Sequence, residues 1–157
     1  MEHSFAFDIF ADYFQFVVMD GSSDDDFSTL WSEEAMNLML AVGETALCLG
    51  TLRNVTVPVE IRVSKSEPPL DLAAYDNAAS ASLHLPSGRL VIMGCTDYLP
   101  EAPCIELAPG TYQLLYLVTG VDTITNEWDP AGDRYIVHLW PSPPRAPTLL
   151  KHWRPSA

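Results

Sequence analysis

Apolar and polar residues alternate along much of this 157-residue chain, with a period of two. From Val55 to Val63 the odd positions are valine or isoleucine, whereas the even positions are threonine, proline, glutamate and arginine. Successive side chains of a strand point to opposite faces, so this segment predicts a strand with one buried face. Pro58 has no N–H to donate to a neighbouring strand, which favours an edge position or a bulge.

Other short runs of the same kind predict an all-β protein. The predicted strands are 5–10, 13–19, 46–51, 82–85, 89–94, 105–107, 111–119 and 134–140. Pro86-Ser87-Gly88 and Ala108-Pro109-Gly110 lie between successive strands and predict hairpin turns. Strands at this spacing indicate a sandwich or a barrel, and we predict an antiparallel β-sandwich formed by residues 1–140 as one domain.

One short helix is predicted at about residues 32–42. The Ser32 hydroxyl is suited to accept a backbone N–H of the first turn, and Glu33 and Glu34 favour the positive end of the helix dipole. Gly43 is predicted to end the helix in the left-handed conformation. The alanine-rich segment 70–80 is either a second helix or an irregular loop.

The composition changes after Trp140. Residues 141–157 contain several prolines and basic residues but no acid: Pro141, Pro143, Pro144, Arg145, Pro147, Lys151, Arg154 and Pro155. This composition predicts an extended, proline-rich, basic tail. Such a tail either lies across its own domain or reaches a neighbouring molecule.

Charge is distributed unevenly along the chain. The formal net charge is −13, and no lysine or arginine precedes Arg53. Asp24, Asp25 and Asp26 are consecutive in this cation-free stretch. A negative field repels nucleic acid and anionic lipid but attracts basic proteins. We therefore predict a protein partner with a basic surface, no direct binding of nucleic acid and no membrane partner.

The cysteines and the N-terminus indicate a cellular compartment. Cys48, Cys95 and Cys104 are an odd number at irregular spacing, which is typical of reduced thiols. No apolar run is long enough to span a bilayer, and the apolar N-terminal residues are not preceded by a basic region. These features predict a cytoplasmic protein.

Two segments combine acids with an aromatic residue, which is the composition of an interface hot spot. The predicted partner-binding residues are Asp24, Asp25, Asp26, Trp31, Glu33, Glu34, Glu127, Trp128 and Asp129. A second interpretation remains open for each segment. The aspartates would then form a solvated connection, Trp31 would fasten the helix to the sheet, and Trp128 would pack under its own loop.

Motifs for catalysis or metal binding are weak. His3, His84, His138 and His152 have no metal-ligand spacing, and no phosphate loop or nucleophile elbow is found. Asp20, Ser22 and Asp24 match the first calcium ligands of an EF-hand. However, Asp25 replaces the required glycine, and Trp31 replaces the bidentate glutamate. We therefore predict that the chain is not an enzyme and needs no metal or cofactor.

Two alternatives to a protein-binding role remain. One is a β-sandwich that binds a small molecule or carbohydrate, with a site near His84, His138 and Trp140. The other is a metal-dependent enzyme built on the aspartate-rich loop. A deep aromatic-lined pocket would favour the first, and a bound cation would favour the second.

Four stretches resemble a known family. They are Tyr13-Phe14-Gln15-Phe16, Trp31-Ser32-Glu33-Glu34-Ala35, Pro109-Gly110-Thr111-Tyr112-Gln113-Leu114 and Arg134-Tyr135-Ile136-Val137. In order and content they resemble the competence protein J family of small nuclease inhibitors, over roughly residues 10–140. The resemblance implies an all-β sandwich with a helix that binds and inhibits a DNA-degrading enzyme. The Asp24–Asp26 run and the basic tail have no counterpart in it.

Overall fold

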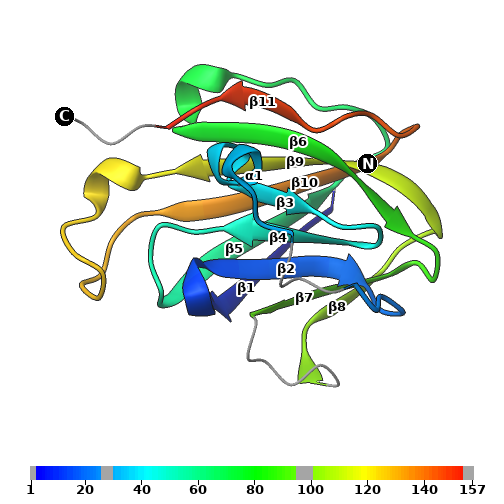
Figure 1. The fold of residues 1–157 in the computed structure, drawn as a ribbon, viewed down its shortest axis with the longest axis horizontal. Helices are drawn as coiled ribbons and strands as arrows, with labels where there is room; N and C mark the ends of the chain where they lie inside the picture. The colour runs from blue at the N-terminus through cyan, green and yellow to red at the C-terminus, as the bar shows by residue number, and fades with distance from the viewer. Residues whose placement is uncertain (1–2, 26–29, 95–100, 154–157) are drawn as a thin grey trace.

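The computed structural model describes residues 3–25, 30–94 and 101–153, whose strands form two sheets packed face to face (Figure 1). The elements are β1 His3–Phe10, β2 Gln15–Asp20, α1 Glu33–Leu38, β3 Leu40–Val42, β4 Ala46–Gly50, β5 Thr56–Val63, β6 Asn77–Leu85, β7 Arg89–Gly94, β8 Cys104–Glu106, β9 Gly110–Thr119, β10 Arg134–Pro141 and β11 Thr148–Lys151. One sheet has the order β1-β5-β10-β9-β6-β11, and the other has β3-β4-β2-β7-β8. Two sheets with one short helix confirm the predicted architecture.

The prediction of a purely antiparallel sandwich was wrong at one pair of strands. β5 and β10 run parallel, with Tyr135 opposite Val59 and Leu139 opposite Val63. About seventy residues separate the two strands, so no tight turn forces them to run in opposite directions. β5 therefore lies inside its sheet, between β1 and β10, and is not an edge strand. The ladder with β10 begins at Val59, so Pro58 has a paired neighbour only in β1.

Both predicted hairpins were also wrong. β6 pairs with β9 and β11, whereas β7 pairs with β2 and β8, so residues 86–88 carry the chain from one sheet to the other. Residues 107–109 do the same between β8 and β9. Turn residues predict a reversal of the chain but not whether the next strand joins the same sheet. Gly88 has φ +75°, and a Cβ there would lie 2.3 Å from the Leu107 carbonyl oxygen.

The helix begins as predicted but ends earlier. Ala35 N donates to Ser32 Oγ at 3.1 Å, which confirms the cap. Met39, at φ +56°, terminates α1 in the left-handed conformation in place of Gly43. Leu40, Ala41 and Val42 pair with β4 as β3. The apolar run after α1 is thus a short strand, and segment 70–80 contains a 3₁₀ turn, Leu72–Ala74, followed by the start of β6.

Apolar side chains fill the space between the sheets and also cover the outer face of one sheet. The main core lies between the sheets, where Phe16 and Tyr116 meet edge to face at 6.0 Å between ring centroids. The outer face of the five-stranded sheet carries a second cluster, which includes the buried Cys48 and is covered by Leu30 and Trp31. Cys48 therefore fills a core. Cys104 is exposed, and Cys95 lies outside the described residues.

The chain after β10 lies along its own domain. β11 pairs antiparallel with β6 and forms the edge of the six-stranded sheet. Arg145 forms an ion pair with Glu67 at 2.9 Å, and Trp153 N donates to Asn77 Oδ1 at 2.9 Å. The basic segment is thus held against β6, as far as residue 153.

Candidate functional site

The predicted partner-binding residues lie at two ends of the sandwich, and strand β2 runs from one end to the other. Asp20, its last residue, donates its backbone N–H to Thr45 O at 2.9 Å. Gln15, its first residue, accepts the Trp31 indole N–H at 2.8 Å and pairs with Gly50. Six residues of strand place these two contacts about 17 Å apart. We call the Asp20 side the loop end and the Gln15 side the cavity end; they lie to the right and left in Figure 1.

Asp20 fastens two turns together at the loop end. Its carboxylate has no exposed surface and accepts hydrogen bonds from the backbone N–H and hydroxyl of both Ser22 and Ser87. Burial raises the pKa of Asp20, but these hydrogen bonds outweigh burial and hold the pKa below its ordinary value of 3.8. Asp20, the first position of the EF-hand-like spacing, therefore has its carboxylate oxygens already hydrogen-bonded to two serines.

The other loop-end aspartates differ from one another. Thr45 N donates to Asp25 Oδ2 at 2.9 Å, so Asp25 joins its loop to the β3–β4 connection. Asp24 is exposed, and Asp26 lies outside the described residues. Across the described parts of the chain, no three His, Cys, Asp or Glu side chains are grouped closely enough to hold a metal ion.

Trp31 lies at the cavity end, away from Asp25. Its ring is half-buried and packs on the outer face of the five-stranded sheet. The contact with Gln15 fits the interpretation that Trp31 fastens the segment before α1 to the sheet. Glu33 and Glu34 follow it in the first turn of α1, and both are exposed.

A cavity of about 690 Å³ gives this end its name. Four segments of the chain line it: Tyr13, Phe14 and Gln15; Trp31, Met36, Asn37 and Met39; Gly50, Thr51 and Leu52; His152 and Trp153. Of these residues only Trp31 was predicted to bind a partner. The adjacent aromatics Tyr13 and Phe14 were visible in the sequence, but the sequence does not show that four distant segments converge.

Strained backbone is concentrated at the cavity. Tyr13, Phe14 and Met39 have φ values of +59°, +60° and +56°, and no other described non-glycine residue has a positive φ. Such conformations cost on the order of 1–3 kcal/mol each for residues with large side chains. The strained turn is held at both sides, because Tyr13 N donates to Asn54 Oδ1 at 3.0 Å and Thr51 N donates to Phe14 O at 2.9 Å.

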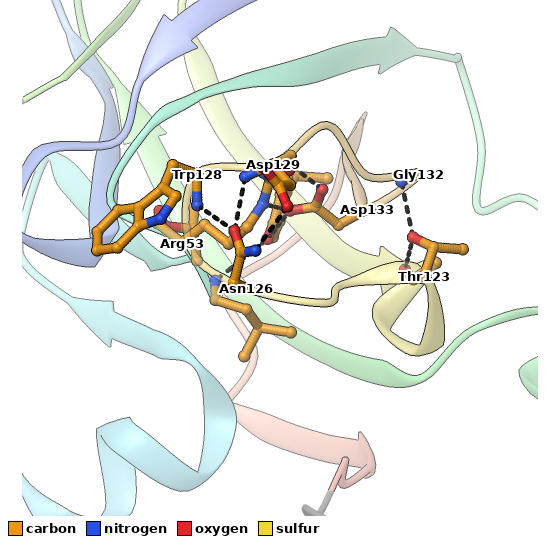
Figure 2. A network of polar contacts seen from close by, with 11 residues as sticks. Arg53, Thr123, Asn126, Trp128, Asp129, Gly132 and Asp133 are labelled. Carbon is orange, nitrogen blue, oxygen red and sulfur yellow. Dashed lines mark hydrogen bonds and ion pairs between the residues drawn. The ribbon is translucent and has the colours of Figure 1, made fainter.

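The loop carrying Trp128 is anchored beside the same end (Figure 2). Asn126 Oδ1 accepts the backbone N–H groups of Trp128 and Asp129, and Arg53 donates to the Asp129 carbonyl oxygen at 2.9 Å. Trp128 is 74% exposed, so it does not pack under its own loop. Glu127 is half-buried, and Asp129 is exposed.

A buried ion pair supports this loop. Arg53 Nη2 lies 2.6 Å from Asp133 Oδ1, and Arg53 Nε donates to Asp133 Oδ2 at 3.1 Å. The Tyr135 hydroxyl donates to Asp133 at 2.8 Å and accepts Leu52 N at 3.1 Å. Burial raises the pKa of Tyr135, which stays neutral as a donor. The first cation of the chain is thus buried and paired, and it adds little positive charge to the surface.

The residues of the small-molecule alternative do not form one site. His84 Nδ1 lies 2.9 Å from Thr111 Oγ1, and the buried His138 Nε2 lies 2.8 Å from Ser64 Oγ. Trp140 contacts His138 edge to face and lines a separate cavity of about 200 Å³ whose lining includes neither histidine. In the described residues, no helix is long and apolar enough to cross a membrane.

Known structures share this arrangement of sheets. The crystal structure of ComJ, inhibitor of the DNA degrading activity of NucA, from Bacillus subtilis, superposes with a TM-score of 0.71. The chain shares its fold with ComJ. The match covers 90% of this chain and 99% of ComJ, at 20% sequence identity. It confirms the predicted resemblance at the level of the fold.

A second solved structure, described as crocagin biosynthetic gene J, matches with a TM-score of 0.62. It is 21% identical, and the match covers 91% of this chain and 99% of that one. No protein-family model and no curated protein sequence matches the chain. ComJ and this second protein therefore share the fold with the chain at an identity that leaves its function open.

Proposed function

We propose that this chain is a cytoplasmic protein that binds and inhibits a nuclease. The observation that carries the proposal is the fold shared with ComJ over 90% of the chain, because ComJ is an inhibitor of a DNA-degrading activity. Binding, rather than catalysis, is the role that this neighbour supports. The strongly acidic composition, with a net charge of −13, is consistent with such a partner.

The charge distribution supplies a physical mechanism. A nuclease binds phosphates, so its active-site cleft is positive and attracts an acidic protein in competition with DNA. The exposed acids Asp24, Glu33, Glu34 and Asp129, and the half-buried Asp25 and Glu127, lie at both ends of the sandwich. Because the Debye length is about 8 Å at physiological ionic strength, association is expected to slow as salt rises. In this mechanism the acids mainly raise the association rate.

The cavity favours a second candidate function, the binding of a small molecule. Its volume of about 690 Å³ lies within the range of small-molecule sites, roughly 300–1,000 Å³. Its aromatic walls also fit such a ligand, although neither His84 nor Trp140 belongs to them. A thermal shift with a small apolar compound, unaffected by salt, would favour this function over nuclease binding.

Co-purification from the source organism tests the main proposal. The tagged chain is used to capture its partners, and the captured fraction is assayed for degradation of DNA. We expect a DNA-degrading activity that appears when the chain is dissociated and disappears when one equivalent is added back. A captured fraction without such activity, or an activity insensitive to excess chain, would contradict the proposal.

A further inference from the structure

We propose that the partner docks at the cavity end, where the cavity receives an apolar side chain presented on a basic loop of the partner protein. This inference rests on the proposed function in one respect, the basic character of the partner. It specifies the contact surface, which the exposed acids alone do not. Acids at the loop end then contribute to the long-range field, and the cavity end provides the contact.

The cavity rim exposes large apolar side chains. Tyr13 and Met36 are 69% and 68% exposed, Phe14 is 47% exposed, and Trp31 and Trp153 form part of the wall. Burying such side chains in a concave site is how interface hot spots gain affinity. Among the residues that the structure describes, the lining contains no Lys, Arg, Asp or Glu. An apolar side chain that enters the cavity therefore does not strip water from a charged group.

Backbone strain points to the same place. Tyr13, Phe14 and Met39 all line the cavity, and each has a left-handed backbone that glycine would adopt more easily. The two rings gain little burial from this conformation, since Tyr13 is 69% and Phe14 is 47% exposed. The strain is explained if the conformation holds these rings in position for a ligand.

Charge complementarity identifies the occupant as a basic protein segment. Asp12 begins the turn that carries Tyr13, and Glu33 and Glu34 begin the helix that carries Met36. The nearby Arg53 is paired with Asp133, so these three acids outnumber Lys151, which keeps its charge while donating to the Leu72 carbonyl oxygen at 2.9 Å. A second copy of the chain would also carry a net charge of −13, so repulsion disfavours it as the occupant.

Selection from a phage library of random, disulfide-closed peptides tests this inference. The full chain is compared with Met36→Arg at the cavity rim and with a matched control, Val42→Arg. Val42 is an exposed residue of β3 beside the loop end. We expect selected peptides to carry an aromatic or large aliphatic residue next to Lys or Arg. They should bind Met36→Arg at least tenfold more weakly than the parent chain and bind Val42→Arg as well as the parent chain.

Three results would overturn the inference: no enriched peptide, enrichment of peptides without basic residues, or equal binding to the parent chain and Met36→Arg. Met36→Ala, which keeps a good helix former at an exposed site, replaces Met36→Arg if the arginine variant melts at lower temperature. The outcome is separable from the proposed function. If peptides bind the cavity but the chain inhibits no nuclease, the docking site stands and the proposed function is refuted. If the parent chain and Met36→Arg inhibit a nuclease equally, the proposed function stands and the docking site is refuted.

Discussion

The two ends of the sandwich use their polar and apolar groups in opposite ways. At the loop end, Asp20 and Asp25 bind serine and threonine donors, so local contacts satisfy these acids. At the cavity end, polar groups are equally well paired around Arg53, but aromatic side chains are exposed on strained backbone. A cluster of acids in a sequence is therefore not necessarily the contact surface. Aromatic side chains that are exposed on strained backbone are better candidates for a contact surface.

The largest effect is expected from removing the buried cation at the cavity end. Arg53→Met leaves Asp133 buried without a counter-charge, and we expect a loss of about 3–5 kcal/mol in the free energy of unfolding. Denaturant unfolding measures it. Arg89→Met, which removes an exposed pair with Glu106, is the control, and its effect on the free energy of unfolding is expected to be much smaller because solvent screens exposed pairs. Equal losses would show that the Arg53 pair is not a structural anchor.

The next effect concerns the loop end. Asp20→Asn removes an acceptor for serine donors, and we expect a loss of about 1–3 kcal/mol at pH 7. The folded pKa of Asp20 lies below the ordinary 3.8, so this stability is present above that pH and is lost as pH falls through the folded pKa. Unfolding of both proteins between pH 7 and pH 2 measures the difference. A difference that grows on acidification would contradict the assigned role.

A smaller effect, of opposite sign, is expected at the strained turn. Tyr13→Gly removes a large side chain but relieves a left-handed backbone, so we expect unchanged stability or a gain of up to about 1 kcal/mol. Phe10→Gly, at another exposed aromatic but in an extended strand, should lose about 1 kcal/mol. Thermal unfolding of both variants compares them. A clear loss for Tyr13→Gly would show that the turn is not strained.

The smallest effect on stability is expected at Trp128. Its side chain is 74% exposed, so Trp128→Ala should change the free energy of unfolding by no more than about 0.5 kcal/mol. Trp31→Ala serves as the comparison, because it removes a packed ring and the hydrogen bond to Gln15. We expect the second change to be clearly larger. Similar losses for both tryptophans would place Trp128 in a structural role.

The sequence predicted the fold well where local patterns decide the structure. Alternation gave β5, β7, β9 and β10 nearly to the residue, and Ser32 marked the start of the helix. The sequence did not predict features that depend on contacts between distant segments. The parallel pairing of β5 with β10, and the two turns that change sheets, depend on which strands meet across the core.

The candidate site shows the same limit. Trp31 was singled out with the aspartates because the two are close in sequence, yet they lie at opposite ends of β2. The cavity draws its lining from four segments, and residues such as Met36 and Trp153 have no local feature that marks them. Left-handed backbone at Tyr13 and Phe14 also goes against residue preference, so it appears only in the structure.

Hydrogen–deuterium exchange of the chain, alone and with its captured nuclease, tests most directly whether the cavity end is the contact surface. Peptides covering 12–15, 36–39 and 50–53 report on the cavity end, and peptides covering 20–25 and 43–46 report on the loop end. We predict slower exchange on binding in the first set and no change in the second. Protection confined to the loop end, with the cavity end unchanged, would contradict the account.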